Sequence, residues 1–123
     1  MDVGLAEGIL LVAAGGAIGA VLRFSIGLAV DSSHFPWATF IVNVIGAFLL
    51  SLITFSYGGI TTETRLFLFT GIFGAFTTMS TFSVETVSMF FDGRMGDALL
   101  NFILNPCLCV LGAVAGRMIA GLI

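Results

Sequence analysis

The chain has 123 residues, of which 59% are hydrophobic and only 9% are charged, and its mean hydropathy is +1.18. These values exclude an ordinary soluble domain and are typical of integral membrane proteins. The net charge is −3 at pH 7 and there is no lysine, so we expect no nucleic-acid partner.

The length leaves room for about four transmembrane helices of roughly 20 residues, so we expect residues 1–123 to form one all-α transmembrane domain. The first helix is expected at about 5–30. Its start carries Asp2 and Glu7 but no basic residue, so it lacks the positive region of a signal peptide and is expected to remain as a span. Four of its residues recur at four-residue spacing and form a ridge that lets another helix approach closely: Gly15, Gly19, Arg23 and Gly27.

The second helix is expected at about 36–57. Pro36 is suited to a first helical turn, and Trp37 is suited to the aromatic belt at a membrane interface. Thr39, Asn43 and Gly46 are spaced so that they share one face of this helix.

The third helix, expected at about 65–91, contains the most unusual segment of the chain. Gly71 and Gly74 weaken the helix, and a cluster of hydroxyl side chains follows them. In hydrocarbon, irregular backbone and several hydroxyls are stable only where they line a cavity or pack inside protein. We therefore predict a break in the middle of this span, at a permeation path or an ion site. If the helix resumes after the break, one of its faces carries Thr78, Thr81, Phe82 and Glu85.

The fourth helix is expected at about 97–122. Gly112 and Gly116 form a second close-packing ridge. Pro106 cannot donate a hydrogen bond to the carbonyl group four residues earlier, so it leaves that carbonyl free. A polar stripe recurs every fourth residue on one face: Asn101, Asn105 and Cys109.

The four arginines predict the topology, because basic residues near the ends of spans set membrane orientation. Arg65 and Arg117 fall on the side of the N-terminus, whereas Arg23 and Arg94 fall on the opposite side. This distribution of two against two favours neither orientation. Two copies inserted in opposite senses can pair about a two-fold axis in the membrane plane, so we predict an antiparallel, dual-topology homodimer.

No spacing in the sequence indicates a nucleophile, a base and an orienting acid, so an enzyme is not expected. The polar stripes of the second, third and fourth helices instead predict a polar conduit. One alternative is that these side chains only hold helices together, at roughly 0.6–2 kcal/mol for each bond. Donors without fixed charge suit a small hydrated anion, whereas free carbonyl groups suit a cation, and the residues by themselves permit both.

Three segments resemble the Fluc/CrcB family of fluoride channels, and the similarity extends over essentially the whole chain. The segments are residues 15–23 (GGAIGAVLR), residues 43–46 (NVIG) and residues 74–82 (GAFTTMSTF). The resemblance implies a small four-helix protein of the cytoplasmic membrane that assembles as an antiparallel dimer and exports fluoride passively through two pores.

The resemblance also implies roles for individual residues. The backbone carbonyls of Gly74 and Thr77 would hold a structural sodium ion at the dimer centre. Asn43 would donate to fluoride, Phe82 would face the ion, and Arg23 would lie near an aqueous vestibule. The other residues implied to line or border the ion pathway are Thr78, Met79, Ser80, Thr81, Ser83, Glu85, Asn101, Asn105 and Cys109.

One position departs from the family pattern, because Met79 stands where the family has phenylalanine. Methionine fills similar space with a polarizable thioether but has no aromatic edge. We therefore expect either a working homodimer with altered rate or selectivity, or one half of a heterodimeric pair.

Two further classes of protein remain as alternatives. A small multidrug-type exporter also has four spans and dual topology, but it needs an embedded glutamate in its first helix, and the only deep acid of this chain is Glu85 in the third. A non-transporting assembly subunit would need no ion pathway.

Overall fold

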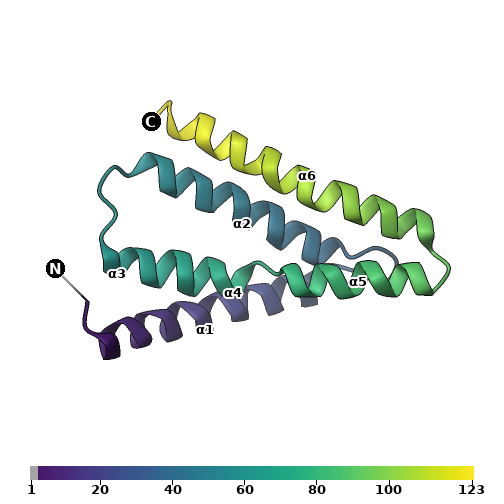
Figure 1. Ribbon diagram of the computed structural model, residues 1–123, viewed down its shortest axis with the longest axis horizontal. Helices are drawn as coiled ribbons and strands as arrows, with labels where there is room; N and C mark the ends of the chain where they lie inside the picture. Colours follow the sequence, from purple (N-terminus) through teal and green to yellow (C-terminus); the bar gives the residue numbers. More distant parts are fainter. Residues whose placement is uncertain (1–2) are drawn as a thin grey trace.

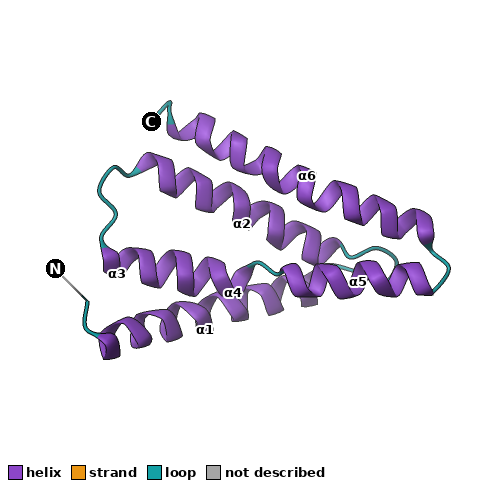
Figure 2. Cartoon of the chain, in the orientation of Figure 1, coloured by secondary structure: helices purple, strands orange, loops and turns teal. Residues whose placement is uncertain are grey.

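Four helical spans make up the computed structural model, which describes residues 3–123 (Figure 2). The first is α1 (Leu5–Ala29), the second α2 (Trp37–Ser56) and the fourth α6 (Met95–Ala120). The third is divided into α3 (Thr62–Thr64), η1 (Arg65–Phe73), α4 (Gly74–Phe76) and α5 (Met79–Phe91). All four spans are long and apolar enough to cross a membrane, which confirms a multi-pass membrane protein.

The ends of the spans lie within three residues of the predicted ends. The third span begins at Thr62 rather than at Arg65, because the Thr61 side chain accepts a hydrogen bond from the Thr64 backbone N–H and caps the helix. The fourth begins at Met95, directly after a turn in which Gly93 has a φ of 79°. Asp2 lies outside the described residues, and Glu7 is exposed in the first turn of α1.

The helices form a flat bundle in which α2 lies between α6 and the third span, while α1 packs against η1 and α4 (Figure 1). Both termini and the α2–α3 loop lie at one end of the bundle, and the α1–α2 and α5–α6 loops lie at the other (Figure 1). Arg65 and Arg117 therefore belong to the first end, and Arg23 and Arg94 to the second. This confirms the predicted distribution of two arginines on each side.

Glycines allow the close packing of these helices. A Cβ atom added to Gly15 or Gly19 would overlap the backbone carbonyl oxygen of Phe67 or Ile72, so only glycine lets α1 approach the third span this closely. Gly116 packs in the same way on α2. The predicted ridge of α1 is wrong at its C-terminal end, because Gly27 is exposed with nothing within 4 Å of an added Cβ atom.

The third span is irregular in two different ways. In η1 the helix is wound with the wider i→i+5 hydrogen bonding of a π-helix, a form that no pattern in the sequence predicts. The break itself lies at Thr77 and Thr78, whose φ/ψ values of −85°/156° and −150°/114° are extended. The predicted break is confirmed, but Gly71 and Gly74 are both helical. Gly71 serves close packing against α1 instead.

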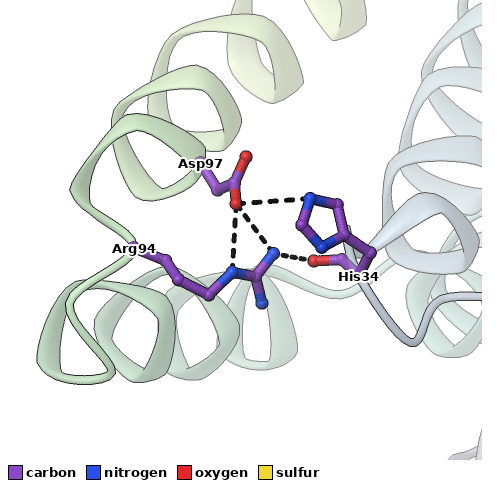
Figure 3. A network of polar contacts seen from close by, with 3 residues as sticks. All are labelled: His34, Arg94 and Asp97. Atoms are coloured by element: carbon purple, nitrogen blue, oxygen red, sulfur yellow. Dashed lines mark hydrogen bonds and ion pairs between the residues drawn. The ribbon is translucent and has the colours of Figure 1, made fainter.

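A polar cluster joins the two loops at the end opposite the termini (Figure 3). The Arg94 Nε and Nη2 atoms lie 3.0 and 2.8 Å from Asp97 Oδ2, and Nη2 also donates to the backbone carbonyl of His34. The imidazole Nε2 of His34 is 3.6 Å from the same carboxylate oxygen. These contacts fasten the α1–α2 loop to the start of α6, so His34 takes part in the fold.

Candidate ion pathway at the helix break

Asn43 of α2 replaces the backbone hydrogen bonds that are lost at the break in the third span. Its Oδ1 atom accepts from the Thr78 backbone N–H at 2.8 Å, and its Nδ2 atom donates to the Thr78 carbonyl oxygen at 3.1 Å. Gly46, one turn further along α2, faces Thr77, whose methyl group an added Cβ atom would overlap. The side-chain amide and the small residue together let an extended peptide exist at this depth, where unpaired backbone groups are costly.

Two backbone carbonyl groups lose their helical donors at the break. In a continuous α-helix the Thr78 N–H would donate to the Gly74 carbonyl and the Thr81 N–H to the Thr77 carbonyl. Here Thr78 donates to Asn43, and Thr81 donates to the Thr78 side chain at 3.1 Å. The carbonyls of Gly74 and Thr77 are therefore available as oxygen ligands, and Gly74 is exposed on the surface of the chain.

Thr78 also begins α5. Its hydroxyl group accepts from the Thr81 N–H and donates to the Thr81 hydroxyl oxygen at 3.0 Å. This is an N-cap with an additional side-chain bond. The Thr81 hydroxyl hydrogen consequently remains free to donate elsewhere.

The polar stripe of α6 is buried against α2 and α5. Asn101 is completely buried, and its Nδ2 atom donates to the Thr86 hydroxyl oxygen at 2.9 Å. Asn105 is 3% exposed, and its Oδ1 atom accepts from Asn43 Nδ2 at 3.4 Å and from Cys109 Sγ at 3.6 Å. Polar residues of α2, α5 and α6 therefore converge and bond directly to one another.

Glu85 and Thr39 extend this polar cluster toward the end opposite the termini. The Thr39 hydroxyl donates to Glu85 Oε1 at 2.9 Å, and Thr39 is buried. The second carboxylate oxygen of Glu85 is buried without a partner in the described part of the chain.

A cavity of about 400 Å³ lies beside the break, and its lining includes both Asn43 and Asn105. Its wall is formed by α2, by the break and the start of α5, and by α6. Phe82, which is buried, and Met79 contribute the apolar part. Cys109 also lines this space.

The remaining candidate residues lie on the outside of the chain. Met79 is 70% exposed, and Ser80, Thr81 and Ser83 are also exposed on α5. The Ser83 hydroxyl donates to the Met79 carbonyl, whereas the Ser80 hydroxyl makes no hydrogen bond within residues 3–123. A row of hydroxyls is unfavourable against lipid, so this face needs water or another protein surface.

Arg23 lies in α1, apart from this cluster. Its side chain is half-buried and makes no salt bridge among the described residues. It is one turn beyond Gly19, which packs on Ile72 of η1, in the half of α1 that leads to the end opposite the termini.

Sequence reasoning missed Thr86. Its hydroxyl donates to the Phe82 carbonyl at 2.7 Å and accepts from Asn101, so it joins α5 to α6. The signal was its position four residues after Phe82 on the predicted helix, which is the spacing for a bond to that carbonyl.

Comparison with known proteins identifies the relatives of this chain. A family model described as "CrcB-like protein, Camphor Resistance" matches residues 10–117. A fluoride-specific ion channel FluC of Idiomarina loihiensis is 44% identical over 114 residues, which are 88% of each chain. A protein of the same name from Ruminiclostridium cellulolyticum is 40% identical over 91% of each chain. Another, from Thermus thermophilus, is 41% identical over 94% of this chain and 99% of its own.

Proposed function

The chain belongs to the CrcB-like family, and from this premise we propose that it is a passive, fluoride-selective channel that exports fluoride across the cytoplasmic membrane. Its relatives carry the name of an ion channel, which agrees with the expectation that it is not an enzyme and leaves the multidrug-type exporter without support. The observation that carries the proposal is the cavity of about 400 Å³ at the break, which is lined by the asparagine side chains of Asn43 and Asn105 and by aromatic and apolar residues.

The proposed pathway runs along the polar faces of α5, α2 and α6. Donors without a formal positive charge can replace part of the water shell of a small anion while holding it weakly enough to let it leave. Ring edges such as that of Phe82 carry partial positive charge and add a weak attraction. The residues that we assign to this pathway are Asn43, Thr78, Met79, Ser80, Thr81, Phe82, Ser83, Glu85, Asn101, Asn105 and Cys109, with Arg23 near its aqueous vestibule.

The carbonyl groups of Gly74 and Thr77 fit a sodium ion, because a hard cation binds backbone oxygens released where a membrane helix unwinds. One chain offers two such carbonyls, too few to enclose the ion. A second copy in the opposite orientation would bring the number to four. We propose that the chain forms an antiparallel homodimer with two pores around such an ion, which would fix the two breaks together.

The exposed face of α5 supports a partner of the same kind. Ser80, Thr81 and Ser83 need protein or water beside them rather than lipid, and an inverted second copy would provide both. The balance of two arginines on each side supports insertion in both orientations.

Fluoride efflux from liposomes that contain only this purified chain tests the proposal. We expect fluoride release once a potassium ionophore balances charge, little chloride release under the same conditions, and no effect of a pH gradient. Protein-free liposomes are the control. If the chain alone releases no fluoride, the homodimeric channel is wrong, and release only after mixing with a second family member would indicate a heterodimer.

A further inference from the structure

Two sulfur side chains line the cavity beside the break. Met79 is the first residue of α5, and Cys109 lies one turn after Asn105 on α6. Both are available as ligands, because Cys109 forms no disulfide and Met79 is 70% exposed. The proposed fluoride pathway uses the space that they line but gives the sulfur atoms no chemistry of their own.

A chain of polar contacts connects these two residues. The Cys109 thiol donates to Asn105 Oδ1 at 3.6 Å, and the same oxygen accepts from Asn43 Nδ2 at 3.4 Å. Asn43 Nδ2 also donates to the Thr78 carbonyl, which belongs to the peptide group that joins Thr78 to Met79. Methionine is unbranched and has three rotatable bonds, so the exposed Met79 side chain can turn toward the thiol without a change in the backbone.

One buried polar group in the lining indicates that the cavity holds a small ligand. Asn105 is only 3% exposed, yet its Nδ2 group has no partner among the described residues. A buried donor without an acceptor costs roughly 1–3 kcal/mol, and a water molecule in the cavity would remove this cost. Water bound to a metal ion beside Cys109 would provide the missing acceptor.

The available donor atoms select the type of ion. Thiolate and thioether sulfur are soft ligands that favour Cu(I). Among the described residues that line the cavity there is no carboxylate or imidazole to hold Zn²⁺ or Mg²⁺. Charge favours the same choice, because one thiolate neutralises one monovalent cation, whereas a divalent ion would leave an uncompensated positive charge within the membrane.

We propose that Met79 and Cys109 form a binding site for a soft monovalent cation, Cu(I), and that the bound ion closes the anion pathway. The Cys109 S–H bond breaks and its proton passes to water, and the thiolate and the Met79 Sδ atom each donate a lone pair to the ion. Copper keeps its +1 charge, so no oxidant or reductant takes part. The metal site stands by itself, and only the closing of the pathway rests on the proposed fluoride channel function.

Copper binding to the purified chain tests the site without any transport. A coloured Cu(I) chelator loses absorbance as it gives up its metal, which measures affinity under nitrogen. Every chain carries Cys107→Ser, because this exposed thiol on α6 lies outside the cavity and would bind copper by itself. Met79→Leu removes the thioether in the cavity, and the matched control Met118→Leu removes one that is 68% exposed on α6 outside it. Leucine and methionine are close in volume, so both variants should fold.

The two-sulfur site predicts a definite order of affinities. We expect one Cu(I) per Cys107→Ser chain, binding at least about tenfold weaker after Met79→Leu, and no loss after Met118→Leu. Cys109→Ser should abolish the site. Equal affinities of the Met79→Leu and Met118→Leu chains would overturn the proposal, because the thiol alone would then hold the metal. Unchanged binding after Cys109→Ser would overturn it as well.

Fluoride efflux from liposomes tests whether the bound ion closes the pathway, and each chain is compared with its own flux without copper. Cu(I) just sufficient to saturate the Cys107→Ser chain should stop efflux through it and through its Met118→Leu variant, and should leave the Met79→Leu variant with most of its flux. Copper binding with undiminished efflux would overturn the closure. A chain that releases no fluoride even without copper would count against the channel function itself, and the binding measurement would still decide the metal site.

Discussion

Replacing Gly19 by alanine tests whether the cost in helix packing outweighs the gain in helix propensity in this bundle. Gly19 is buried where α1 meets η1, and a Cβ atom there would overlap the Ile72 carbonyl oxygen and lie 2.9 Å from its carbonyl carbon. The obstacle is backbone of another helix, which cannot rotate away as a flexible side chain can. Relief requires that α1 and the third span move apart.

The two opposing effects have known sizes. Replacing glycine by alanine inside a helix gains up to about 1 kcal/mol from propensity. Forcing a methyl group into a well-packed interface costs roughly 1–3 kcal/mol, and separating the helices also weakens the neighbouring contact of Gly15 with Gly71. The net effect of Gly19→Ala is therefore a loss of about 1–2 kcal/mol. Gly27→Ala lies in the same helix with open space around it, so it should cost nothing or stabilise slightly.

Thermal unfolding of both variants in the same detergent, followed by the amount of folded protein that survives heating, measures this difference. We expect the midpoint of Gly19→Ala to fall below that of the wild-type chain by on the order of 5 °C and that of Gly27→Ala to stay level or rise. Equal midpoints for the two variants would show that the close approach of α1 and η1 does not limit stability, and the packing argument would then fail.

Three further substitutions address other contacts. Thr86→Val keeps the shape of the side chain but leaves the fully buried Asn101 amide without an acceptor, so the free energy of unfolding in detergent should fall by about 1–3 kcal/mol. The matched control Thr54→Val, on the exposed surface of α2, should change it little. Asp97→Asn weakens the ion pair with Arg94, in which the Arg94 and Asp97 side chains are 31% and 29% exposed. The free energy of unfolding should therefore fall by no more than about 1 kcal/mol, and by less when salt is added. A salt-independent loss as large as that of Thr86→Val would contradict this. Met79→Phe adds an aromatic edge, whose attraction for the anion is worth about 0.5–1.5 kcal/mol. Fluoride flux in liposomes should therefore rise roughly two- to tenfold. Unchanged flux would mean that this side chain does not meet the ion.

Features that depend only on residues close together in the sequence could be predicted from it. Four apolar runs of the right length give four spans, because each helix satisfies its own backbone in lipid wherever it lies. The hydroxyl cluster after Gly74 correctly located the break to within a few residues. The cause was not the glycines, since Gly71 and Gly74 are helical and the chain leaves the helix at Thr77.

The partners of the buried polar groups were decided only by the tertiary structure. Asn43 bonds to Thr78, 35 residues away, and to Asn105, 62 residues away, and nothing local to Asn43 indicates either contact. The direction in which each amide faces depends on these contacts in turn. Hydropathy shows that a polar side chain must find a partner in the membrane, but which partner it finds depends on which helices pack together. Small residues such as Gly46 and Gly19 control that packing, because they set how closely two backbones can approach.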